Sequence, residues 1–134
     1  MIFIDTGAFY ASKISDDINH SSAKSIEKSI SDGKFGKMIT TNYILDELYT
    51  LLRRNLSHNQ TIKIGTAIRK SPNIRTIWIL EVIEEKAWSY FKKNQDKEYS
   101  FTDCSSFVIM ESLGINFAFS YDSHFEQAGF QCLR

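Results

Sequence analysis

The stretch Met1–Tyr10, MIFIDTGAFY, decides the fold that we expect for the whole chain. The unbroken apolar run MIFI precedes Asp5, and the turn-forming pair Thr6-Gly7 follows it. A short continuous apolar run of this kind is typical of a strand that is buried on both faces of a parallel sheet. Because parallel strands need a crossover connection, we expect a helix from about Ala8. Asp5 then lies at the carboxyl end of the first strand.

Outward from this stretch, strand patterns and helix patterns alternate. Short segments with β-branched, aliphatic or aromatic content predict further strands at residues 37–40, 74–79, 116–121 and 129–133. Apolar spacing of 3.6 residues and helix-end signals predict helices at residues 20–31, 41–55, 58–70, 80–94 and 102–113. Such alternation implies parallel pairing through right-handed crossovers. We therefore expect a three-layer α/β/α sandwich with a small, mostly parallel, twisted sheet.

Capping signals mark three expected helix starts. Ser57 begins a capping-box pattern before residues 58–70, and Thr102 is in place to cap the helix that follows it. Ser123 with Glu126 three residues later forms a second capping-box pattern. We expect this last pair to leave Asp122 free for another role.

Length and composition fit one globular domain over residues 1–134. A hydrophobic fraction of 43% allows a core without disulfide or metal staples. No apolar run approaches the roughly 18 residues that span a bilayer, and the first residues lack the basic region of a signal peptide, so we expect a cytoplasmic protein with no membrane contact. Cys104 and Cys132 lack metal-ligand spacing, and we expect them to be reduced and outside the chemistry.

The charge is balanced in number but not in distribution. Sixteen basic residues face sixteen acidic ones, yet residues 48–80 contain no acid. The basic residues in this window are Arg53, Arg54, Lys63, Arg69, Lys70 and Arg75. Such polarity is expected where an acidic metal pocket lies beside a rim that follows phosphates. A solvated helix face explains the same cluster equally well.

Four carboxylates are expected to meet at one edge of the sheet. Asp5 and Asp122 follow strands whose carboxyl ends share that edge, where ligands bind in doubly wound sheets. Asp103 lies in the first turn of its helix on an inward stripe. At 100° per residue, Asp46 falls opposite the apolar face of its helix, whereas Glu47 falls at the border of that face and can reach a cleft. We therefore choose Glu47.

Clustered carboxylates repel one another unless a cation or a proton is shared among them. Oxygen ligands without a histidine or cysteine partner favour Mg²⁺ or Mn²⁺ and argue against zinc. A bound ion of this kind polarises a phosphate and lowers the pKa of its water. Each acid also has a purely structural explanation, as a turn, a helix-end or a surface residue. Their joint placement at one edge is what favours a metal site.

Four segments in this order resemble the acidic motifs of PIN domains, above all those of the VapC-type toxins: IDTGAF, TTNYILDELYTLLRR, FTDCSSFVIMESLG and AFSYDSHF. The resemblance runs from Ile2 to about Phe130. It implies that the metal-binding and catalytic residues are Asp5, Glu47, Asp103 and Asp122. Thr6, Thr102 and Ser120 are the expected supporting residues.

The resemblance also implies a function. We expect a divalent-metal-dependent endoribonuclease, acting as the toxin of a type II pair whose antitoxin inserts a basic side chain into the acidic pocket. A homodimer, a solitary RNA-processing nuclease and a catalytically idle binding scaffold are open alternatives. The residues expected to hold the RNA backbone are Arg53, Arg54, Arg69, Lys70 and Arg75.

A phosphoacceptor receiver module is excluded, although it is also a small doubly wound domain. It would need an acidic pair after the first strand, an aspartate after the third and a lysine after the last. This chain has Asp5 alone, no aspartate directly after residues 74–79 and no lysine after residue 97.

Overall fold

Five parallel strands form a single sheet in the computed structural model, which describes residues 1–134. Their order is β3-β2-β1-β4-β5, and every neighbouring pair runs parallel. The strands are β1 (Ile2–Ile4), β2 (Met38–Thr41), β3 (Ile74–Ile77), β4 (Phe117–Phe119) and β5 (Gln131–Leu133). The expected α/β fold is confirmed, with a sheet that is wholly rather than mostly parallel.

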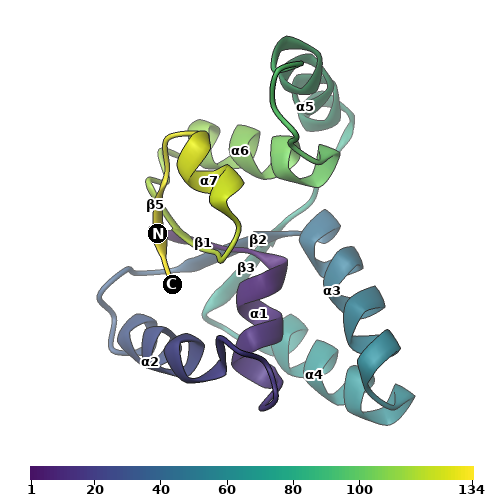
Figure 1. Ribbon diagram of the computed structural model, residues 1–134, viewed down its shortest axis with the longest axis vertical. Coiled ribbons are helices and arrows are strands. Elements are labelled where there is room, and N and C mark those ends of the chain that lie inside the picture. Colours follow the sequence, from purple (N-terminus) through teal and green to yellow (C-terminus); the bar gives the residue numbers. More distant parts are fainter.

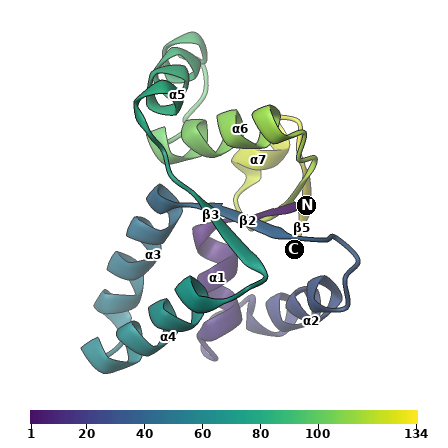
Figure 2. The same cartoon turned by 180° about the vertical axis from the view of Figure 1, so that it is seen from behind.

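Helices cover both faces of this sheet. They are α1 (Thr6–Lys13), α2 (His20–Ser31), α3 (Asn42–Asn55), α4 (His58–Lys70), α5 (Glu81–Lys93), α6 (Phe101–Leu113) and α7 (Ser123–Gln127). Figure 1 shows α1 to α4 on one side of the sheet and α5 to α7 on the other, and the opposite view in Figure 2 shows the same division. None of these helices is both long and apolar enough to cross a bilayer.

The central strand and the helix α6 form the middle of the core. All three residues of β1 are buried, which explains why its sequence is apolar without alternation. Phe107 of α6 is fully buried and meets Phe125 edge to face, with the ring centroids 5.1 Å apart. Cys104 is buried and Cys132 half-buried, and both thiols are free.

The strand order reverses at β1. The chain first adds β2 and β3 on one side of β1 and later adds β4 and β5 on the other. The backbone N–H of Asp5 donates to the carbonyl oxygen of Phe119 at 3.1 Å, so the ends of β1 and β4 are joined where the two strands stop. This is the switch point at which a doubly wound sheet opens a crevice beyond its carboxyl edge.

Candidate active site

A cavity of about 510 Å³ opens at the carboxyl ends of β1 and β4. The four predicted acids all line it, although they come from four separate parts of the chain. The full lining is Asp5, Thr6, Gly7, Glu47, Glu98, Ser100, Asp103, Tyr121, Asp122 and His124. The fold thus brings together the side chains that the sequence analysis selected.

Asp5 is the most buried of these acids. It is the residue before α1, which begins at Thr6 rather than Ala8, but its side chain does not cap that helix. Instead its Oδ2 accepts a hydrogen bond of 2.8 Å from Ser120 Oγ. Loss of solvation raises the pKa of Asp5 to about 7, and the neighbouring charges of Asp103 and Asp122 add to this rise. A carboxyl in this environment is mostly protonated below about pH 7 unless a cation compensates its charge.

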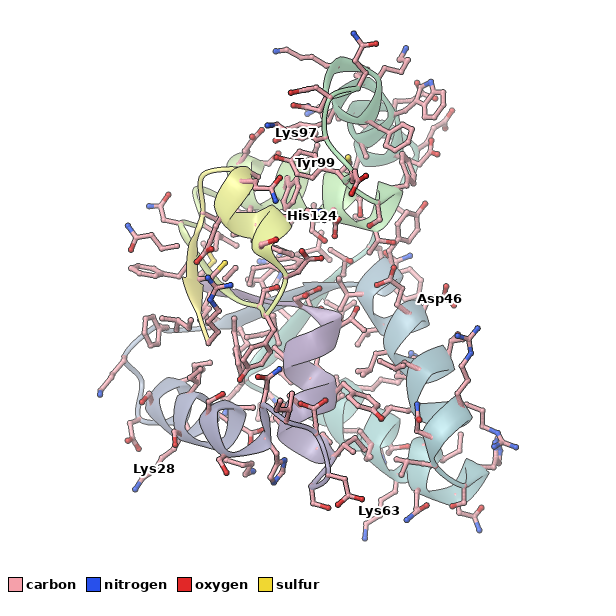
Figure 3. The ribbon with its side chains drawn as sticks, in the orientation of Figure 1. Lys28, Asp46, Lys63, Lys97, Tyr99 and His124 are labelled. Carbon is pink, nitrogen blue, oxygen red and sulfur yellow. The ribbon has the colours of Figure 1, made fainter.

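Glu47 lies in the second turn of α3 and faces α1. Its Oε2 accepts a hydrogen bond of 2.9 Å from Thr6 Oγ1. Asp46 instead lines a different cavity, together with Trp78 and Tyr43, and Figure 3 shows it on the outer side of α3. The two neighbouring acids therefore lie on different faces of the helix, as the spacing of 100° per residue predicts.

Asp103 is fixed by the start of α6. Its Oδ2 accepts from the backbone N–H of Ser100 at 2.9 Å, and Ser100 Oγ accepts from the Asp103 N–H, also at 2.9 Å. This is a complete capping box, so Ser100 is the N-cap and the prediction that Thr102 caps this helix was wrong. Thr102 lies inside the first turn, and it does not line the cavity.

Asp122 has a capping role that we expected Ser123 to take. Asp122 is the N-cap of α7, and its Oδ1 accepts from the backbone N–H of His124 at 2.8 Å. The backbone N–H of Asp122 donates to Ser120 Oγ at 3.0 Å. Ser120 therefore links Asp122 to Asp5, because the same hydroxyl donates to the Asp5 carboxyl. Capping uses one oxygen of Asp122 and leaves Oδ2 without a protein donor.

Two lining residues with ligand atoms were missed by the sequence analysis, Glu98 and His124. His124 Nδ1 lies 3.0 Å from Asp103 Oδ2 and 3.4 Å from Asp122 Oδ1. Ligand atoms of these three residues lie within 4.8 Å of one another, a spacing that could hold a metal ion. The expectation of an acid set without histidine was therefore wrong. The signal was available, since His124 is only two residues beyond Asp122 at the same sheet edge.

The donor set of the cavity fits a hard divalent cation. Five carboxylates line it, and no lysine or arginine does. Glu47, Asp103 and Asp122 each have one oxygen held by a protein donor, while the other oxygen accepts no hydrogen bond from the protein. Oxygens held in this way are suited to Mg²⁺ or Mn²⁺, which prefer carboxylate and water ligands.

The predicted cationic residues lie outside this cavity. Arg53, Arg54 and Arg69 line a separate one of about 560 Å³ between α3 and α4. Lys70 and Arg75 are exposed and line neither. None of the three arginines forms an ion pair.

Known proteins match this chain along nearly its whole length. The PIN domain family model matches residues 2–131. The 23S rRNA-specific endonuclease VapC20 of Mycobacterium tuberculosis is 35% identical over 130 residues, covering 97% of this chain and 95% of that protein. A VapC ribonuclease of Archaeoglobus fulgidus is 33% identical over 124 residues, covering 91% of this chain and 77% of that protein.

Solved structures agree with these matches. The crystal structure of Mycobacterium tuberculosis VapC20, described as a sarcin-ricin loop cleaving toxin, has a TM-score of 0.88 at 34% identity and covers 97% of this chain and 96% of that one. FitAcB from Neisseria gonorrhoeae shares the fold, with a TM-score of 0.69 at 16% identity and coverage of 100% and 97%. The chain therefore belongs to the PIN-domain family and is a homologue of its VapC-type toxin ribonucleases.

Proposed function

We propose that this VapC-type endoribonuclease hydrolyses RNA phosphodiester bonds with Mg²⁺ or Mn²⁺ held by Asp5, Glu47, Asp103 and Asp122. The observation that carries the proposal is the cavity at the switch point, which has five acids and no basic lining residue except His124. When bound, the ion would polarise the scissile phosphate and lower the pKa of a water molecule. The acids are intact and converge, which favours a nuclease over an idle scaffold.

The protein's own groups prepare the site. Ser120 Oγ and Thr6 Oγ1 donate to Asp5 and Glu47, and these hydrogen bonds restrict how the two carboxylates rotate. Burial of Asp5 makes its ionised form costly without a cation, so cation binding and loss of the Asp5 proton are coupled. We expect divalent-ion affinity to increase with pH up to about 7.

We further propose that the arginine-lined cavity between α3 and α4 holds the RNA backbone. Arg53 and Arg54 lie two turns beyond Glu47 on the same helix, roughly 10 Å along its axis at 1.5 Å per residue. This separation is short enough for one RNA molecule to contact both places. Arg69 faces the same cavity from α4. Contacts to phosphates would position the RNA without reading its sequence.

One of the relatives, VapC20, supports a structured ribosomal RNA as the substrate class. VapC20 is described as specific for 23S rRNA and as cleaving the sarcin-ricin loop, and it aligns with 97% of this chain at 35% identity. We propose a folded loop of ribosomal RNA as the target here, which places the reaction in the cytoplasm. As for other VapC-type toxins, we propose an antitoxin partner whose basic side chain neutralises the acidic cavity. A solitary processing nuclease is the competing function.

Cleavage of defined RNAs tests this function. The purified chain is incubated with Mn²⁺ and either a sarcin-ricin stem-loop or the same stem with a scrambled loop. We expect a single cut in the first RNA and little cleavage of the second, with Asp5→Asn inactive on both. Equal cleavage by wild type and Asp5→Asn would contradict the proposed site. If wild type cleaves both RNAs and Asp5→Asn cleaves neither, the proposed site stands but the proposed substrate is refuted.

A further inference from the structure

The imidazole ring of His124 is anchored to the core of the protein. It is partly buried and meets the ring of Tyr99 edge to face, with centroids 5.4 Å apart and an interplanar angle of 73°. Tyr99 is itself buried and packs in the same manner on Phe107, at 5.1 Å. Figure 3 shows Tyr99 and His124 next to each other between α6 and α7. These contacts hold the imidazole in one orientation.

In that orientation, Nδ1 of the ring lies close to two of the proposed metal ligands and is hydrogen-bonded to one of them, Asp103. Nδ1 lies 3.0 Å from Asp103 Oδ2 and 3.4 Å from Asp122 Oδ1. Ionised carboxylates only accept hydrogen bonds, so Nδ1 must carry the proton in this arrangement, whatever the state of Nε2. His124 is therefore the donor that links the first turn of α6 to the start of α7.

We propose that His124 is a positioning residue for metal binding: its Nδ1 donates to Asp103 Oδ2 and its backbone N–H donates to Asp122 Oδ1, so that each carboxylate keeps one oxygen for the cation. The proposal rests on the function proposed above. Asp103 Oδ2 is fully occupied by His124 and the Ser100 N–H, which leaves Oδ1 without a protein donor. Residues that hydrogen-bond metal ligands in this way typically change metal affinity by about 10-fold to 100-fold when they are replaced.

Three substitutions of His124 separate the effect of its hydrogen-bond donor from the effect of its imidazole ring. In His124→Asn, the amide nitrogen can occupy the place of Nδ1, whereas in His124→Gln it is one bond too far away. His124→Ala removes the donor altogether. The matched control for Mn²⁺ affinity is His58→Ala, because His58 is an exposed residue at the start of α4 that lines the arginine-lined cavity and not the acidic one.

Mn²⁺ affinity, measured by the electron paramagnetic resonance of free Mn²⁺, is the primary measurement. We expect His124→Ala and His124→Gln to bind Mn²⁺ about 10-fold more weakly than wild type and His124→Asn to stay within about threefold. We also expect saturating Mn²⁺ to restore most of the RNA cleavage rate of His124→Ala. Equal affinity in wild type and His124→Ala would overturn the proposal, and so would a loss in His124→Asn as large as that in His124→Ala.

Electron spin echo measurements on the Mn²⁺-loaded wild type separate positioning from direct ligation. Positioning predicts no directly coordinated ¹⁴N, and a strong ¹⁴N coupling that disappears in His124→Ala would overturn it in favour of a nitrogen ligand. The same measurements distinguish failure of this proposal from failure of the proposed function. If the wild-type protein binds no Mn²⁺, both the metal site and the role of His124 are refuted. If the wild-type protein binds Mn²⁺ and cuts RNA, and His124→Ala has the same Mn²⁺ affinity, only the role of His124 is refuted.

Discussion

Thr6 Oγ1 donates a hydrogen bond of 2.9 Å to Glu47 Oε2, and this bond joins the first residue of α1 to the second turn of α3. The two residues are far apart in sequence, yet both line the acidic cavity. Glu47 is otherwise exposed, so the bond to Thr6 is what directs its carboxylate toward the site.

Replacing Glu47 is expected to reduce activity strongly, whereas replacing its neighbour Asp46 is expected to change it little. Glu47→Gln removes a charged ligand from the proposed metal site, and we expect RNA cleavage to fall by roughly 100-fold or more. Asp46→Asn is the matched control, because Asp46 lines another cavity on the outer side of α3. Initial cleavage rates under equal Mn²⁺ measure both variants. A larger loss in Asp46→Asn would contradict the assignment of the two helix faces.

Asp5→Asn should stabilise the metal-free protein at pH 8. The pKa of Asp5 is about 7 in the folded chain against an ordinary value of 3.8, so the folded state binds the proton more tightly than the unfolded state. The contribution of Asp5 to stability is therefore largest below pH 4 and falls as pH rises to about 7, above which the cost of the buried charge is fully present. Asparagine has no such charge.

Thermal unfolding in EDTA at pH 5 and pH 8 checks this expectation. The difference in Tm between Asp5→Asn and wild type should be larger at pH 8, and addition of Mn²⁺ at pH 8 should raise the Tm of wild type only. If the difference in Tm is the same at both pH values, the pKa of Asp5 is not raised in the folded protein.

Two capping boxes allow stability to be separated from metal binding. Ser100 and Ser57 cap α6 and α4 in the same manner, but only Ser100 lines the acidic cavity. Ser100→Ala and Ser57→Ala should each lower the free energy of unfolding by about 1 kcal/mol. Only Ser100→Ala should also weaken Mn²⁺ binding, since it releases the turn that holds Asp103. Equal Mn²⁺ affinity in both variants would show that the Ser100 cap does not position Asp103.

Arginines on α3 should govern RNA binding and leave the chemical step unchanged. In Arg53→Gln/Arg54→Gln we expect KM for RNA to rise about 10-fold with kcat unchanged, and the slope of log affinity against log salt to weaken by about 0.7 for each lost phosphate contact. Lys63→Gln, an exposed change on α4 that leaves the arginine-lined cavity intact, is the control. A fall in kcat at constant KM would instead assign these arginines to catalysis or folding.

The position of the acids could be predicted because it depends on strand ends. Apolar runs mark β1 and β4, and the switch-point rule places Asp5 and Asp122 at one edge without knowledge of any side-chain contact. The choice of Glu47 over Asp46 needed only the helical period. Local sequence was sufficient to predict the position of an acid wherever a single strand or helix determines that position.

Errors arose where the outcome depended on packing or on competing caps. The contact between His124 and Asp103 depends on how α7 packs against α6, and no local pattern encodes that distance. Thr102 has a side chain that can cap a helix, but only a residue three positions before Asp103 can exchange both bonds of a capping box with it, and that residue is Ser100. Asp122 took the capping role of Ser123 because its carboxylate already reaches the His124 N–H.

Mn²⁺-dependent cleavage of a sarcin-ricin stem-loop by wild type and Asp103→Asn is the most direct test of the proposed metal centre. Asp103→Asn keeps the volume of the side chain and an oxygen that can accept from the Ser100 N–H, but removes the charge. We predict that wild type cuts only when Mn²⁺ or Mg²⁺ is present and that the variant is slower by roughly 100-fold or more at every Mn²⁺ concentration. Equal rates for the two proteins, or undiminished cleavage by wild type in EDTA, would contradict a metal-dependent nuclease at this site.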